Sequence, residues 1–136
     1  MFLDSAYAIA LSSPKDEYHE RAVILADQIE AEGAQLITTR AVILEIGDAL
    51  SSSSYRKAAI QLLASIENDP NFVEVVPMSE ELYEQGFKLY RSRPDKEWGI
   101  TDCISFVVMQ STNLIEALTT DRHFQQAGFQ ALLREV

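Results

Sequence analysis

A chain of 136 residues, 47% of them apolar and 24% charged, can fill one hydrophobic core but leaves little room for a second, so we expect a single domain over residues 1–136. No apolar run approaches the roughly 18 residues needed to cross a bilayer, and no secretory signal is visible, so we expect a cytoplasmic protein with no membrane partner. Cys103 is the only cysteine, which excludes an internal disulfide and a thiolate zinc cluster.

Strands and helices alternate along the whole chain. Short β-branched or apolar runs bounded by turn residues predict strands at 2–3, 36–38, 72–76, 114–119 and 129–133. Apolar residues at helical spacing predict helices at 7–11, 18–29, 41–50, 55–66, 80–90, 101–109 and 122–127. This order indicates an α/β fold, a three-layer α/β/α sandwich around a mostly parallel five-stranded sheet.

Four carboxylates fall where one edge of such a sheet is expected. Asp4 follows the first strand, Asp121 follows the fourth, and Asp102 lies in the first turn of an apolar helix. Glu45 lies about one and a half turns into the helix that follows the second strand. In a parallel sheet the carboxyl ends of the strands and the N-termini of the following helices share one edge, where ligands bind. We therefore expect these acids to converge.

Each acid also has a structural explanation that stays open. Asp4, Asp102 and Asp121 all occupy positions where an aspartate commonly caps a helix N-terminus. Glu45 does not fit that explanation, because it lies in the middle of an apolar helical run. We expect it to be buried there, and an unpaired buried carboxylate is costly, so Glu45 should need a partner such as Arg40 or a metal ion.

The chemistry of clustered carboxylates points to a divalent cation. Acids held close together repel each other, so at least one should have a raised pKa or the group should recruit a cation. An all-oxygen ligand set suits Mg²⁺ or Mn²⁺ and not zinc. Beside a phosphodiester, such an ion neutralises oxygens and lowers the pKa of a bound water. Because Mg²⁺ keeps several waters, some of the four acids should act by positioning water.

The net charge of −10 opposes a nucleic-acid partner, because phosphates repel an acidic surface. Cations bound at the carboxylates would reverse the charge locally. Basic residues can also concentrate on one surface, and four of the eleven Lys and Arg residues fall within 88–96. Asp95 and Glu97 lie in or next to that stretch, so a solvated mixed-charge loop is the alternative interpretation.

Four segments resemble the motifs of the PIN domain and, within that family, of the VapC-type toxins of bacterial toxin–antitoxin pairs. The segments are Phe2-Leu3-Asp4-Ser5, Thr39-Arg40-Ala41-Val42-Ile43-Leu44-Glu45, Ile100-Thr101-Asp102-Cys103-Ile104 and Leu118-Thr119-Thr120-Asp121-Arg122-His123-Phe124. The resemblance implies a parallel five-stranded sheet between helices and an Mg²⁺- or Mn²⁺-dependent endoribonuclease acting on RNA. It implies that the core acids are Asp4, Glu45 and Asp102, that Asp121 is a more variable fourth, and that the acids or water are held by Ser5, Thr101 and Thr120.

The resemblance also implies a possible antitoxin partner. Because the site is negative, we expect an inhibitory Arg or Lys of that partner to reach Asp4 and Asp102. Three residues near the acids are candidate substrate contacts: Arg40, Arg122 and His123. Arg122 could instead form a simple ion pair, and His123 could be an ordinary surface histidine.

Trp98 could stack on a base or pack its loop onto the body of the protein, and packing is the favoured interpretation. A homodimer is expected because Tyr83, Phe87 and Tyr90 exceed the apolar surface that one helix face can bury. The alternative function is a PIN-like binding module without turnover. A phosphatase with an Asp4 nucleophile is disfavoured, because such enzymes need a second aspartate two positions later, where this chain has Ala6.

Overall fold

The computed structural model describes residues 1–134. In chain order its elements are β1 (Phe2–Leu3), α1 (Ser5–Ser12), α2 (His19–Glu32), β2 (Leu36–Thr39), α3 (Arg40–Ala49), α4 (Arg56–Asn68), β3 (Val73–Val76), α5 (Glu80–Ser92), α6 (Ile100–Ser111), β4 (Glu116–Leu118), α7 (Arg122–Gln126) and β5 (Gln130–Ala131). The expected alternation of strands and helices is confirmed. Within these residues, no helix is both long enough and apolar enough to cross a membrane.

The strands form one sheet in the order β3-β2-β1-β4-β5. All of the neighbouring pairs are parallel, so the sheet is fully rather than mostly parallel. The first strand lies at its centre, where Phe2 is in register with Ile37 on one side and Ala117 on the other. The chain therefore reverses direction across the sheet at β1, and the carboxyl end of β1 is the place where the topology predicts a ligand site.

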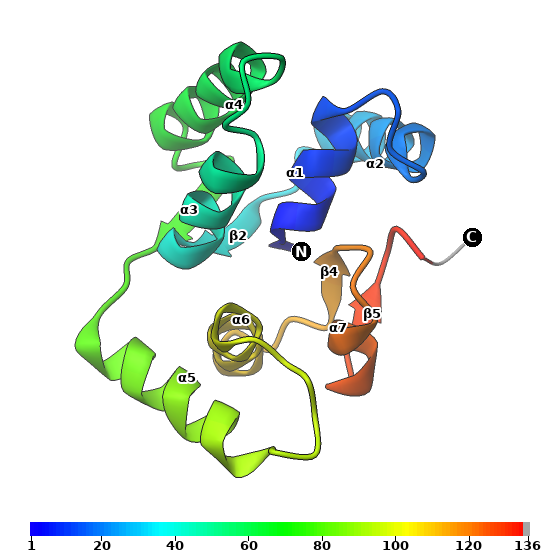
Figure 1. Ribbon diagram of the computed structural model, residues 1–136. Helices are drawn as coiled ribbons and strands as arrows, with labels where there is room; N and C mark the ends of the chain where they lie inside the picture. Colours follow the sequence, from blue (N-terminus) through cyan, green and yellow to red (C-terminus); the bar gives the residue numbers. More distant parts are fainter. Residues whose placement is uncertain (135–136) are drawn as a thin grey trace.

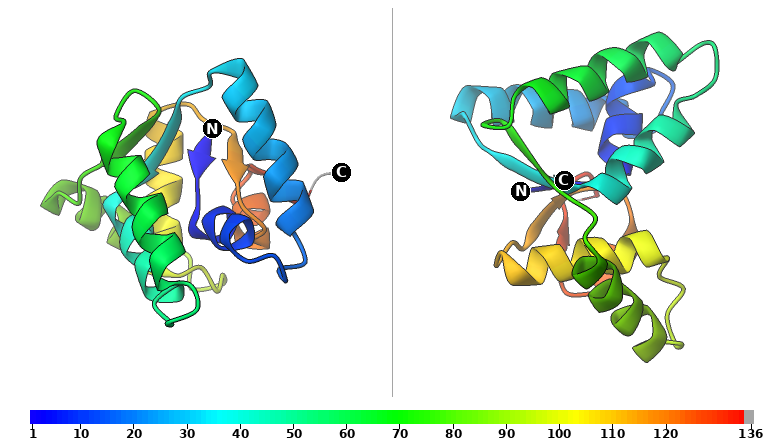
Figure 2. Two further views of the ribbon diagram at one scale, coloured as in Figure 1. Left: turned by 90° about the horizontal axis from the view of Figure 1, so that it is seen from above. Right: turned by 90° about the vertical axis from the view of Figure 1, so that its left-hand side faces the viewer.

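Helices cover both faces of the sheet, which confirms the three-layer arrangement. Helices α1 to α4 form one layer and α5 to α7 form the other (Figures 1 and 2). Between the sheet and the second layer, the ring of Phe106 packs edge-on against Phe124 at 4.9 Å, and Phe124 in turn lies 6.3 Å from Phe2. These three side chains are fully buried, so they join β1, α6 and α7 into one core.

Close packing of α5 on α6 depends on a glycine. Gly86 is buried, and a Cβ atom built on it would lie 3.3 Å from the Cα of Ile104 and closer still to the Ile104 side chain. A larger residue would push the two helices apart. Position 86 therefore sets how closely the outer helix approaches α6, whose N-terminal turn carries Asp102.

The last two strands are shorter than the apolar runs predicted. Strand β4 begins at Glu116 rather than residue 114, and β5 contains only Gln130 and Ala131. Among residues 1–134, β5 pairs only with β4 and so forms an edge of the sheet, and the chain turns after Ala131. The apolar residue Leu133 is buried within that turn rather than in a strand.

Candidate active site

The structure places the predicted acids around the carboxyl ends of β1 and β4. Asp4 directly follows β1, and Asp121 lies three residues beyond the end of β4, at the N-terminus of α7. Asp102 occupies the first turn of α6. The charges of Glu45 and Asp102 both act on Asp4, and the charge of Asp121 acts on Asp102. Residues separated by up to 117 positions in the sequence thus form one electrostatic group.

Asp4 is the buried member of the group, with 5% of its surface exposed. Its Oδ2 accepts a hydrogen bond of 2.7 Å from the hydroxyl of Thr119. Burial raises the pKa of the Asp4 carboxyl from 3.8 to about 7; hydrogen bonds from Thr119 and the Ser5 amide oppose the shift, and the charges of Glu45 and Asp102 add to it. A carboxylate in this position is poorly compensated by its neighbours, so it favours either a proton or a nearby cation.

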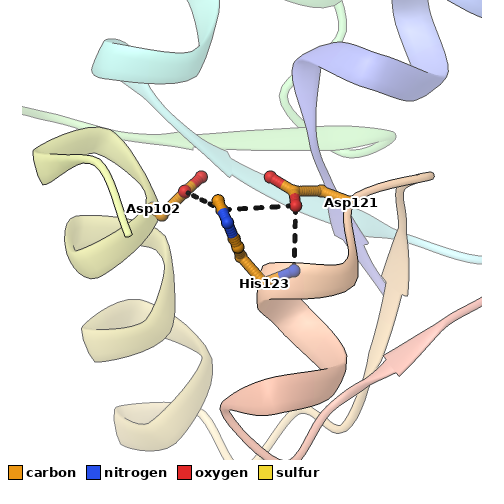
Figure 3. A group of neighbouring side chains, drawn as sticks. All are labelled: Asp102, Asp121 and His123. Atoms are coloured by element: carbon orange, nitrogen blue, oxygen red, sulfur yellow. Dashed lines mark hydrogen bonds and ion pairs between the residues drawn. The ribbon is translucent and has the colours of Figure 1, made fainter. Parts of the chain in front are cut away.

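Asp102 and Asp121 face each other across the imidazole of His123 (Figure 3). The Nδ1 of His123 lies 3.2 Å from Asp102 Oδ2 and 3.3 Å from Asp121 Oδ1. Burial raises the pKa of Asp102, and the charge of Asp121 raises it further. Ligand atoms of all three side chains lie within 4.8 Å of one another, a spacing that could hold one metal ion.

The capping explanation holds for two of these aspartates without removing them from the site. Asp121 Oδ1 accepts the backbone N–H of His123 at 2.8 Å, and Asp102 Oδ2 accepts that of Gly99 at 3.2 Å. Each carboxylate has a second oxygen. Capping therefore fixes the orientation of Asp102 and Asp121 and leaves part of each group available for a ligand.

The expectation that Glu45 is buried was wrong. Glu45 and its neighbour Leu44 are both exposed, Leu44 by 62%. Arg40 does not pair with Glu45 but with Glu67 of α4. The reason is helical geometry, because five residues place Arg40 and Glu45 about 140° apart around α3. Glu45 is held instead by the hydroxyl of Ser5, which donates to Glu45 Oε1 at 2.6 Å.

Of the expected supporting hydroxyls, Ser5 is in contact with an acid, whereas Thr101 and Thr120 make no side-chain hydrogen bond within residues 1–134. The hydroxyl that connects the site belongs to Thr119, which the sequence reasoning missed. Its O–H donates to Asp4, and its oxygen accepts the backbone N–H of Asp121 at 3.0 Å. The sequence signal was the buried strand end Leu118-Thr119, where a polar side chain must find a partner.

Trp98 and Arg122, which the sequence offered as candidate RNA contacts, have different environments. Trp98 is buried and packs its ring edge-on against Phe106 at 5.1 Å, so the packing interpretation is confirmed. Arg122 is exposed beside Asp121 and lines the same hollow as Asp121 and His123.

The donors at this edge fit a divalent cation. The group combines a buried carboxylate of raised pKa with two further aspartates whose oxygens approach one position, and oxygen ligands of this kind suit Mg²⁺ and Mn²⁺. His123 adds a nitrogen that Mn²⁺ accepts more readily than Mg²⁺ does. The arrangement can therefore concentrate positive charge at a surface that is otherwise acidic.

Comparison with known proteins agrees with this geometry. A family model described as the PIN domain matches residues 1–130, a range that includes all four acids. No curated protein matches the chain. Among solved structures, the crystal structure of the VapC20 toxin of Mycobacterium tuberculosis, described as cleaving the sarcin–ricin loop, has a TM-score of 0.81 and 25% sequence identity, over 95% of each chain. The similarity therefore extends over the whole three-layer fold.

Proposed function

Because this chain belongs to the PIN domain family, we propose that it is an endoribonuclease that hydrolyses RNA phosphodiester bonds with Mg²⁺ or Mn²⁺ and serves as the toxin of a toxin–antitoxin pair. The observation that carries the proposal is the convergence of Asp4, Glu45, Asp102 and Asp121 at the carboxyl end of the central strand. The likeness to a VapC toxin that cleaves the sarcin–ricin loop supports an RNA substrate.

Asp4, Asp102 and Asp121 are the proposed metal ligands. When bound, the ion would neutralise phosphate oxygens and lower the pKa of a water for attack on phosphorus. Asp4 is buried beside a hydroxyl rather than a cationic side chain. A bound cation would therefore stabilise the charged form of Asp4 relative to its protonated form. Glu45 is exposed, and Ser5 fixes one of its oxygens, so its role is to accept a proton or a hydrogen bond from water.

RNA cleavage with and without metal tests this proposal. We expect the wild-type protein to cut RNA oligonucleotides in Mn²⁺, to stop in EDTA, and to lose at least about a hundredfold in rate in Asp4→Asn. Asp27→Asn is the matched control, because Asp27 is an exposed aspartate on α2. Cleavage that survives both chelation and Asp4→Asn would contradict the mechanism. An absence of Mn²⁺ binding by titration calorimetry would favour a binding module without turnover.

An antitoxin that occupies this site should bring a positive charge. Asp102 retains 19% side-chain exposure, and its charge acts on the more deeply buried Asp4. An Arg or Lys of the partner would therefore meet Asp102 first and compensate the charge of both carboxylates. A structure of the complex without a basic side chain at Asp102 would refute this part of the proposal.

We also propose a homodimer through the outer face of α5. Tyr83 and Phe87 stack at 6.2 Å and leave 49% and 39% of their surfaces exposed, and Tyr90 extends the same face with 47% exposed. Three exposed aromatic rings on one helix face are typical of an interface. Sedimentation showing only a 15.3 kDa species at working concentration would contradict the dimer.

A further inference from the structure

Two neighbouring hollows lead away from the acid cluster. The first, of about 400 Å³, is lined by Asp121 and His123 of the cluster and also by Lys96 and Arg122. The second, of about 520 Å³, is lined by the end of α5 and the loop that follows it, up to the start of α6. Lys96 and Glu97 line both hollows, so the two lie next to each other on the surface. We call this surface the basic trough.

The trough has one more basic than acidic side chain, although acids outnumber bases in the chain as a whole. Four of the eleven Lys and Arg residues line it, namely Arg91, Arg93, Lys96 and Arg122. The acids that line it are Asp95, Glu97 and Asp121, of which Asp121 belongs to the proposed metal centre. Asp95 is already engaged by Arg93, with both nitrogen–oxygen distances at 3.0 Å. On a chain of net charge −10, cations thus gather beside the acid cluster.

Trp98 holds the loop between α5 and α6, which lines the trough, in place against α7. The Arg93 guanidinium carbon lies 5.1 Å from the centroid of the Trp98 ring. The indole Nε1 of Trp98 donates to Gln126 Oε1 at 3.0 Å, and Gln126 lies on α7, the helix that also carries Arg122 and His123 (Figure 1). The cations of the loop and of α7 are therefore held on one framework with the acid cluster.

Phosphodiester groups are the ligands that this arrangement suits. Guanidinium and ammonium groups bind phosphate strongly, and an exposed ion pair such as Arg93–Asp95 is weak enough to open one face to a phosphate. On the other side of the cluster, Arg40 is paired with Glu67. We propose, resting on the function proposed above, that the RNA strand next to the cleaved bond follows the basic trough, with Arg122, Lys96 and Arg93 binding its phosphates.

RNA binding by a cleavage-inactive protein tests the trough. The full-length Asp4→Asn protein is titrated into a fluorescein-labelled single-stranded RNA of 12 nucleotides in Mn²⁺, and anisotropy is recorded at several salt concentrations. Adding Lys96→Ala and Arg122→Ala should raise Kd about tenfold and lower the log–log salt slope by about 1.4, since a contact on single-stranded nucleic acid contributes about 0.7. The matched control adds Lys15→Ala and Lys57→Ala, which remove the same charge from exposed positions in the loop between α1 and α2 and on α4.

The controls separate the trough from the proposed function. If both double variants weaken RNA binding equally, the loss reflects net charge alone. If Lys96→Ala/Arg122→Ala leaves Kd unchanged, RNA does not use the trough. Either result overturns the proposal. If the same double variant in the otherwise wild-type protein raises KM with kcat unchanged, the trough binds substrate. If wild-type protein cleaves RNA and KM does not change, the nuclease function stands and the trough fails. If the wild-type protein binds RNA through the trough but cleaves none, the trough stands and the nuclease function fails.

Discussion

Replacing the buried Asp4 carboxylate with an amide should make the metal-free protein more stable at high pH and less stable at low pH. Asp4→Asn preserves the shape of the side chain and an oxygen that can accept from the Thr119 hydroxyl. It removes the charge that burial penalises. It also places an NH₂ group at a buried position, which costs about 1–3 kcal/mol if the group finds no acceptor.

The magnitude follows from the pKa of Asp4. Because the pKa is about 7 in the folded protein and 3.8 in the unfolded chain, the folded state binds the extra proton between these values. The contribution of Asp4 to stability is therefore fully present below pH 3.8 and is lost as the pH rises through about 7. The full difference corresponds to about 4 kcal/mol, and relaxation around the buried charge lowers the expected effect to about 2–4 kcal/mol.

Thermal unfolding in EDTA at a series of pH values measures this effect. About three fifths of this effect develops between pH 5 and pH 8, since the rest is already lost between pH 3.8 and pH 5. Over this window the melting temperature of Asp4→Asn should rise relative to wild type by roughly 4–7 °C, at about 3 °C per kcal/mol for a domain of this size. Asp27→Asn should show no such change, because Asp27 is exposed. If the melting temperatures of wild type and Asp4→Asn change with pH by the same amount over this range, the reasoning is refuted.

Other substitutions test separate parts of the structure. Glu45→Gln should lower Mn²⁺-dependent cleavage about 10- to 100-fold without changing the melting temperature, and Ser5→Ala should cause a smaller loss; a drop in stability for Glu45→Gln would show a structural role instead. Thr119→Val should cost about 1–3 kcal/mol in urea unfolding and weaken Mn²⁺ binding in calorimetry, and unchanged binding would separate Thr119 from the site. Gly86→Ala should destabilise the protein by about 1–3 kcal/mol because α5 must move from α6, whereas Gly47→Ala, with only an ordinary contact at 3.7 Å, should stabilise it by about 0.5–1 kcal/mol. Equal effects of the two glycine substitutions would contradict the packing argument.

The placement of the aspartates was predictable because local sequence determines it. Asp4 and Asp121 follow short apolar strands, and Asp102 follows a glycine at the start of an apolar helix, so each position is defined by the element beside it. The alternation of strands and helices then brings those ends to one edge of a parallel sheet. The fold class and the region of the site needed no further information.

The environment of Glu45 and the role of Thr119 depend on packing that local sequence does not determine. The apolar run around Glu45 resembles a buried helix, but only one side of α3 faces the protein, and Leu44 and Glu45 lie on the other. Thr119 contacts Asp4 across 115 positions, and this contact requires β1 and β4 to be neighbours. The order of strands in the sheet is a property of the whole fold, so this pairing could not be read from either segment.

The most direct test of the proposed metal centre is the anomalous difference density of a crystal soaked in Mn²⁺. The site geometry predicts one or more peaks among the four acids, about 2.1 Å from carboxylate oxygens of Asp4, Asp102 or Asp121, with His123 bound to the ion or displaced from between its two aspartates. Mn²⁺ peaks at other surface carboxylates, with none in this group, would contradict the account.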